Sequence, residues 1–197
     1  MILGVILARG GSKRLPFKNM RLLGGRPLVG WSILAALESA WIDRIVVSSD
    51  DLEILGYAST FGAVECLQRP AHLAQDHTSA YDALIHAIGK MGTDCAEVVL
   101  LQPTSPLRNA GDIEGCVHLL HGPPGTPEAA VTKETGKETP NGAVYAATVR
   151  WIKAGGNWDT PGLPVHWMPP ERSVDINTAE DLERAEGLVL AMETKAA

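Results

Sequence analysis

The sequence predicts an α/β protein with a mostly parallel sheet, because short β-branched runs alternate with helical patterns. The runs Val5–Ala8, Arg44–Ser49 and Val98–Leu101 are short and apolar, as buried strands are. Each is followed by a segment in which apolar residues recur at helical spacing. Alternation of this kind produces right-handed βαβ units, so these strands are expected to run parallel in one sheet.

Helices are expected over residues 27–39, 52–61 and 113–120, in the connections that follow the three strands. A further helix is expected to begin near Ser79, because Asp82 stands three residues on, as in a capping box, and apolar residues at helical spacing follow.

The last helix is predicted to begin after Thr178, with Asp181 completing its cap. Residues 120–141 are rich in Gly, Pro, Thr, Lys and Glu, so they are expected to be mostly loop, with one short strand over 129–132. No repeat or linker divides the chain, and residues 1–197 are predicted to form a single domain. The buried stripe of the last helix is predicted to contain Leu182, Ala185, Val189 and Met192.

The charge balance excludes one class of partner and indicates another. The net charge of −6 disfavours nonspecific nucleic-acid binding, which depends on clustered Lys and Arg. Basic residues nevertheless gather between Arg9 and Arg26, which indicates a small anionic ligand. The three cysteines show neither disulfide nor zinc spacing. The apolar start of the chain lacks the features of a signal peptide and no stretch is long enough to span a membrane, so a cytoplasmic location is expected.

A basic turn with two glycines follows the first strand, at the edge where open α/β sheets bind ligands. Gly10 and Gly11 permit positive φ and close backbone approach, so their N–H groups are expected to form an anion nest. An ordinary solvated loop is an alternative interpretation. The turn matches neither the dinucleotide fingerprint nor the P-loop, which argues against a Rossmann oxidoreductase and a P-loop kinase. The cations of the turn are Arg9, Lys13, Arg14 and Lys18.

Residues 6–19, ILARGGSKRLPFKN, resemble the signature [IL]-x-A-R-x-x-S-K-x-[IL]-x-x-K-N of the acylneuraminate cytidylyltransferases, or CMP-sialic acid synthetases. The resemblance implies a three-layer, Rossmann-like fold of the nucleotide-diphospho-sugar transferase type. It also implies a Mg²⁺-dependent nucleotidyltransferase that moves CMP from CTP to the anomeric hydroxyl of a nonulosonic acid and releases pyrophosphate. Further segments that resemble the family, in the family's order, are residues 43–50, 68–76, 100–108 and 173–181.

The resemblance implies that Lys18 and Arg9 stabilise phosphate charge, with Lys18 nearest the α-phosphate, and that Ser12 also contacts the phosphates. It implies that Asn19 and Arg69 meet the nucleoside; for Arg69 a surface charge is the alternative. The implied nucleotide-binding set is Ala8, Arg9, Gly10, Gly11, Ser12, Lys18, Asn19, Arg69 and Ser79.

Residues 141–145, NGAVY, resemble the family's N-G-A-[IV]-Y segment, which implies that Asn141 and Tyr145 approach the sugar. Gln102 would face the sugar as well. A strand-end polar residue is the alternative for Gln102, and a core residue is the alternative for Tyr145. The six histidines show no metal-ligand spacing, and none is assigned a catalytic role.

The family's metal-binding Asp-x-Asp reads Asp175-Ile-Asn177 in this chain. The resemblance implies that Asp175 is the principal Mg²⁺ ligand and a catalytic residue, with Asn177 as second ligand on the same face of a strand. Asn177 could instead be the N-cap of the last helix. Either Asp175 or a metal-bound hydroxide could deprotonate the sugar.

Residues 120–141 are shorter than the family's dimerisation arm, so a homodimer is expected to be weaker than is usual in the family. Two other functions remain open at this point. One is a cytidylyltransferase for Kdo, legionaminic or pseudaminic acid. The other is a nucleotide-binding protein without turnover.

Overall fold

A mixed sheet forms the centre of the protein in a computed structural model that describes residues 1–91, 94–123 and 125–196. Its strand order is β5-β4-β1-β6-β8-β7-β9. The strands are β1 (Ile2–Leu7), β4 (Arg44–Ser49), β5 (Val64–Gln68), β6 (Glu97–Leu101), β7 (Ala129–Glu134), β8 (Pro140–Thr148) and β9 (Val165–Met168), and a separate small hairpin contains β2 (Leu22–Leu23) and β3 (Arg26–Pro27).

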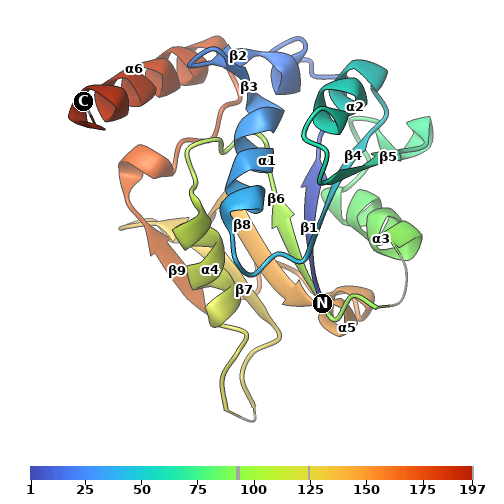
Figure 1. The fold of residues 1–197 in the computed structure, drawn as a ribbon. Coiled ribbons are helices and arrows are strands. Elements are labelled where there is room, and N and C mark those ends of the chain that lie inside the picture. The colour runs from blue at the N-terminus through green and yellow to red at the C-terminus, as the bar shows by residue number, and fades with distance from the viewer. Residues whose placement is uncertain (92–93, 124, 197) are drawn as a thin grey trace.

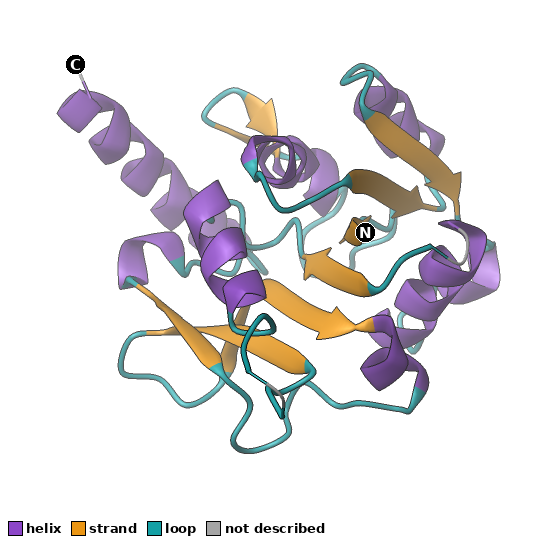
Figure 2. Ribbon diagram, turned by 60° about the horizontal axis from the view of Figure 1, so that its bottom comes forward, coloured by secondary structure: helices purple, strands orange, loops and turns teal. Residues whose placement is uncertain are grey.

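Helices cover both faces of the sheet, which gives the predicted three layers (Figures 1 and 2). One face packs against α1 (Leu28–Glu38), α2 (Leu52–Ser59) and α4 (Ala110–His118). The other face packs against α3 (Ala80–Met91) and α5 (Val149–Lys153). The last helix, α6 (Ala179–Ala196), packs with the first loop and α1 in a third apolar cluster. Short 3₁₀ helices are η1 (Lys18–Met20), η2 (Ala71–Leu73) and η3 (Pro170–Arg172).

The prediction of a mostly parallel sheet is confirmed. Strands β5, β4, β1 and β6 pair in parallel, as βαβ connections require. Strand β8 runs antiparallel to both of its neighbours, and β9 is again parallel to β7. The sequence pattern did not predict β5, β8 or β9, because their apolar runs are interrupted by polar, small or exposed residues.

Helix ends follow local hydrogen bonds. Ser79 Oγ accepts from the backbone N of Asp82 at 3.1 Å, so the predicted start of α3 is confirmed. α4 begins before the predicted residue 113, because Asn109 and Asp112 form a capping box. In α6, Ala185 and Val189 are buried as predicted, but Met192 is 37% exposed. The prediction for Met192 is wrong because the C-terminal part of α6 extends beyond the body of the protein (Figure 1).

The stretch between α4 and β8 is loop apart from β7, as predicted for its described residues. No helix of the described chain is long and apolar enough to cross a membrane.

Candidate active site

Two adjoining cavities open at the carboxyl ends of the parallel strands. The first cavity has a volume of about 510 Å³ and is lined by the loop after β1, the segment 69–80 and the end of β6. The second cavity, of about 360 Å³, lies between β8, the turn before it and residues 173–184. Gln102 lines both cavities, so they meet at the end of β6.

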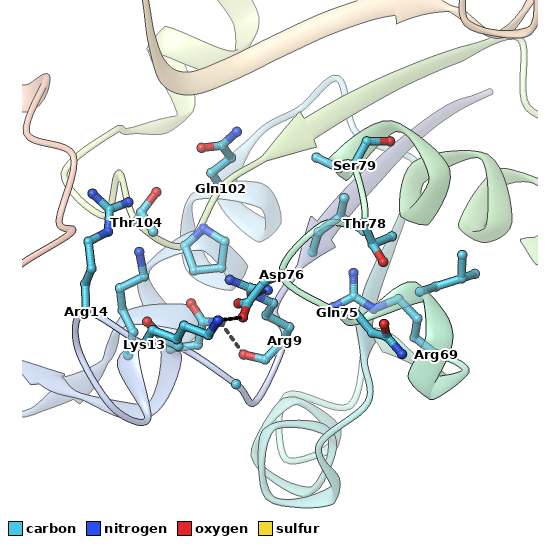
Figure 3. Close-up of a pocket in the computed structure, with 18 of the residues that line it drawn as sticks. Arg9, Lys13, Arg14, Arg69, Gln75, Asp76, Thr78, Ser79, Gln102 and Thr104 are labelled. Carbon is cyan, nitrogen blue, oxygen red and sulfur yellow. Dashed lines mark hydrogen bonds and ion pairs between the residues drawn. The ribbon is translucent and has the colours of Figure 1, made fainter.

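The first cavity is strongly cationic, and Asp76 is the carboxylate among its described lining residues. Asp76 Oδ1 lies 3.0 Å from Arg9 NH1, and Asp76 Oδ2 lies 2.6 Å from Lys13 Nζ (Figure 3). The hydrogen bond from Lys13 lowers the pKa of Asp76. Because these side chains are partly exposed, the ion pairs are weak, and an anionic ligand can displace Asp76. The cations that line the cavity are Arg9, Lys13, Arg14, Lys18 and Arg69.

Arg69 is only 5% exposed, so the interpretation of Arg69 as a surface charge is wrong. Its backbone N–H donates to the carbonyl of Ser49, which holds it beside β4. Its side-chain Nε and NH2 have no hydrogen-bond partner among the described residues. Burial lowers the pKa of Arg69. A buried cation with open donors is unfavourable without a ligand, so Arg69 indicates a binding site for an acceptor group or anion.

Lys18 connects the first cavity to the segment before α6. Its Nζ donates to the carbonyl of Ile176 and to Asn177 Oδ1, both at 3.1 Å. Burial lowers the pKa of Lys18, and the nearby Asp175 carboxylate opposes that shift. The amide of Asn177 then reaches Asp175, because Asn177 Nδ2 donates to Asp175 Oδ2 at 2.6 Å. Since Asp175 lines the second cavity, a hydrogen-bonded chain joins the two cavities.

These contacts fix the orientation of the Asn177 amide. Lysine and arginine only donate, so the atom facing Lys18 and Arg14 NH2 must be the amide oxygen. The amide nitrogen therefore faces Asp175, and Asn177 does not offer an oxygen to a cation beside Asp175. The helix-cap alternative is wrong, because Thr178 Oγ1 accepts from the backbone N of Asp181 at 3.3 Å. The prediction that this segment is a strand is also wrong.

The first loop differs in detail from the expected anion nest. Gly10 N donates to Asp50 Oδ1 at 3.0 Å, so this N–H is not free for a ligand. A Cβ at Gly10 would lie 2.5 Å from Asp51 Oδ2, which explains the glycine by close packing. Neither Gly10 nor Gly11 has positive φ; in this loop Phe17 does, at 55°. Ala8 is fully buried and its N–H donates to the Ser48 carbonyl, so the side chain does not line either cavity.

The other residues of the implied nucleotide site line the first cavity. Gly11, Ser12 and Ser79 lie on its wall, and Ser79 also caps α3. Asn19 is 7% exposed, and its Nδ2 donates to the Arg9 carbonyl at 2.8 Å, which holds the two ends of the loop together.

A buried arginine, Arg108, holds the backbone at Gln102, and the sequence pattern did not indicate this residue. Arg108 donates through NH2 to the Gln102 carbonyl and through NH1 to Ser32 Oγ at 2.7 Å. Burial lowers the pKa of Arg108 to about 9. These contacts fix the backbone at the point where the cavities meet.

Asn141 and Tyr145 line the second cavity, but in different ways. Asn141 Oδ1 accepts from Thr132 Oγ1 and from the backbone N–H of Ala143. Its Nδ2 donates to Ser173 Oγ at 3.1 Å and to Met168 Sδ at 3.3 Å. Its amide is therefore fully used within the protein. Tyr145 packs against Trp158 with the two rings tilted and their centroids 5.2 Å apart, and burial raises the pKa of Tyr145 to about 12. Tyr145 thus belongs both to the core and to the cavity wall.

The fold is a three-layer α/β sandwich with a cationic cavity at the carboxyl ends of its parallel strands, and it is shared by solved nucleotidyltransferases. Solved structures with this fold include a CMP-2-keto-3-deoxy-manno-octonic acid synthetase in complex with CTP, with a TM-score of 0.75, 18% identity and coverage of 97% of this chain and 99% of that one. They also include a nucleotidyl transferase from Methanothermobacter, with a TM-score of 0.75, 16% identity and coverage of 98% and 99%. At these identities the likeness establishes the fold alone.

A model of the cytidylyltransferase family matches residues 3–123, more than half of the chain. The chain therefore belongs to the cytidylyltransferase family. It is 43% identical to the CMP-N,N'-diacetyllegionaminic acid synthase of Legionella pneumophila over 60% of this chain and 52% of that protein. It is 38% identical to the N-acylneuraminate cytidylyltransferase of Escherichia coli over 60% of this chain and 28% of that protein. The chain thus spans about half, or less, of the length of these relatives.

Proposed function

We propose that the protein transfers CMP from CTP to the anomeric hydroxyl of a nonulosonic acid and releases pyrophosphate. The observation that carries the proposal is the junction of the two cavities, where Gln102 lines both and Asn177 joins Lys18 to Asp175. A cationic cavity suits a triphosphate, and an adjoining cavity of mixed charge suits a hydroxylated acid. Relatives named for legionaminic, neuraminic and pseudaminic acids support this class of acceptor.

In this proposal the triphosphate displaces Asp76 and lies among Arg9, Ser12 and Lys18. The acceptor hydroxyl gives up its proton, to Asp175 or to solvent. Its oxygen forms a bond to the α-phosphorus while the bond from that phosphorus to the bridging oxygen of the β-phosphate breaks and pyrophosphate leaves. Lys18 is held at the junction by Ile176 and Asn177, so its charge stabilises the phosphate oxygens as charge is redistributed. Asn19, Arg69 and Ser79 bind the nucleoside part.

We propose Mg²⁺ as the metal, with Asp175 as its protein ligand. Among the described residues no three His, Cys, Asp or Glu side chains gather in a metal-binding group. Mg²⁺ usually takes one or two carboxylates together with water and substrate phosphates, so the exposed Asp175 beside the triphosphate cavity fits it. Bound there, the ion would offset the negative charge of the phosphates. Asn177 holds Lys18 and Asp175 instead of contributing a metal ligand.

The direct test mixes the protein with CTP, Mg²⁺ and a panel of acids: N-acetylneuraminic, N,N'-diacetyllegionaminic, pseudaminic and 2-keto-3-deoxy-manno-octonic acid. Pyrophosphate release and the mass of the product are measured. The proposal predicts pyrophosphate and a CMP–sugar conjugate only when both CTP and an acid are present. Tight CTP binding without pyrophosphate release from any acid would show a nucleotide-binding protein without turnover.

A further inference from the structure

We infer that Arg184, on α6, binds the carboxylate of the acidic acceptor in the second cavity. This inference rests on the proposed function and adds the residue that selects for an acid. It starts from the charges that line the second cavity. They are two cations, Lys137 and Arg184, and three carboxylates, Glu134, Asp175 and Asp181.

Lys137 already has a partner inside the protein. Its Nζ lies 2.6 Å from Glu134 Oε2 in the turn between β7 and β8. The Glu134 side chain is 15% exposed and the Lys137 side chain 60%, so the carboxylate is the shielded member of the pair. A carboxylate ligand that approached Lys137 would therefore also meet Glu134.

Arg184 has no such partner. In the part of the chain that the structure describes, its guanidinium forms no hydrogen bond, and no carboxylate lies within 4.0 Å of it. The carboxylate one turn earlier, Asp181, influences Arg184 electrostatically but is committed elsewhere. Asp181 Oδ2 accepts from the backbone N–H groups of Asn177 and Thr178, both at 2.9 Å, at the start of α6.

The other two carboxylates of the cavity also have partners within the protein. Asp175 accepts from Asn177, and Glu134 pairs with Lys137. Arg184 is exposed at the mouth of this cavity, and among the described residues it is the cation of the cavity that no carboxylate of the protein pairs with. A guanidinium binds a carboxylate through two parallel N–H···O bonds, which a single ammonium group cannot reproduce.

The position of Arg184 also bears on the reaction. In a ulosonic acid the carboxylate and the anomeric hydroxyl are attached to the same carbon. The side chain that holds the carboxylate therefore also determines where the hydroxyl points. Arg184 and Asp175 line the same cavity, and Asp175 is joined through Asn177 to Lys18 in the first cavity. A carboxylate on Arg184 directs the neighbouring hydroxyl towards this junction.

The test compares wild type with Arg184→Gln and Arg184→Lys, using the panel acid that wild type converts best and the methyl ester of that acid. Arg184→Gln is expected to raise KM for the acid by roughly 10- to 100-fold and to remove the preference for acid over ester. For Arg184→Lys, KM for the acid and the preference for acid over ester should lie between the values of wild type and Arg184→Gln. KM for CTP and Tm should stay at their wild-type values. Glu183→Gln, exposed on the same helix and outside both cavities, is the matched control and should change none of these.

A KM for the acid within twofold of wild type in Arg184→Gln, with the preference for acid retained, would overturn the inference and leave the proposed function standing. A loss of Tm and of CTP affinity together would assign Arg184 a structural role, which also overturns it. If wild type converts no acid of the panel, the proposed function itself fails, and the inference fails with it.

Discussion

The two cavities lie at the same edge of the sheet but differ in charge. The first is lined by five cations and one carboxylate, Asp76. The second is lined by two cations and three carboxylates. Loops that follow parallel strands form much of the first cavity, whereas β8, a turn and the start of α6 form the second. In the proposed function, this difference assigns the highly charged triphosphate to the first cavity and the acidic acceptor to the second.

The strongest test of this contrast is Lys18→Ala, at the junction. If the Lys18 charge acts mainly as the α-phosphate reacts, kcat should fall by about 10²–10³-fold while Kd for CTP changes only a few-fold. Steady-state kinetics and calorimetric CTP titration give the two values. Lys13→Ala is the matched control, because Lys13 lines the same cavity but is exposed and pairs with Asp76. It should weaken CTP binding and leave kcat unchanged. Unaltered turnover in Lys18→Ala would contradict the role of Lys18.

The lowered pKa of Lys18 gives a second test of its role, through the pH dependence of activity and stability. Its charge is lost as pH rises through that pKa, so kcat/KM for CTP should fall on the alkaline side below pH 10.5, its ordinary value. Between the lowered pKa and 10.5 the folded protein binds fewer protons at this group than the unfolded chain does. Lys18 therefore makes the free energy of unfolding rise with pH over this window. Lys18→Ala should remove that contribution.

Substitutions of the two buried arginines, Arg69 and Arg108, should affect different properties: the first CTP binding and the second stability. Arg69→Met removes a cation with open donors, so Tm should be unchanged or higher while CTP affinity falls by roughly 10- to 100-fold. Arg108→Met removes the guanidinium donors from Ser32 Oγ and from the Gln102 carbonyl, to which the Ser105 N–H still donates, so it should destabilise the protein by about 1–3 kcal/mol. Thermal unfolding and CTP titration of both variants check this. Equal destabilisation by the two changes would show that Arg69 is structural.

Asn177→Asp should have a smaller effect, on metal dependence. The change places a second carboxylate opposite Asp175. In wild type, Asn177 Nδ2 and Asp175 Oδ2 are 2.6 Å apart. The repulsion between the two carboxylates favours a bound cation, so the Mg²⁺ concentration for half-maximal rate should fall several-fold. Mg²⁺ should also raise Tm more than in wild type. Asn177→Ala, which adds no carboxylate, is the control. The same half-maximal Mg²⁺ concentration in wild type and Asn177→Asp would contradict this account of the segment.

The first cavity could be predicted from sequence far better than the second. Its loop is a continuous motif after a buried strand, so Arg9 and Lys18 follow from local order and the parallel topology, and Ser12 from the family resemblance. The pattern did not show that Gly10 donates to Asp50 or that Asp76 pairs with the loop cations, because these contacts join distant segments. Arg108 was missed because its role depends on packing around β6, and the sequence pattern gave no reason to propose a role for Arg184, whose position depends on the packing of α6.

Asn177 shows why a motif position does not by itself define a role. Its place in Asp-x-Asn suggested a metal ligand or a helix cap. Both interpretations consider the Asn177 amide without the side chains that contact it. The structure gives it Lys18 on one side and Asp175 on the other, and only donor and acceptor chemistry then fixes its orientation.

The central claim is that two adjoining cavities bring CTP and an acid together for one direct displacement. Initial rates of pyrophosphate release, measured over a grid of CTP and acid concentrations, test it most directly. Double-reciprocal plots should intersect, because both substrates must be bound before the bond to the α-phosphorus forms. Parallel lines, with pyrophosphate released from CTP before the acid binds, would contradict the claim.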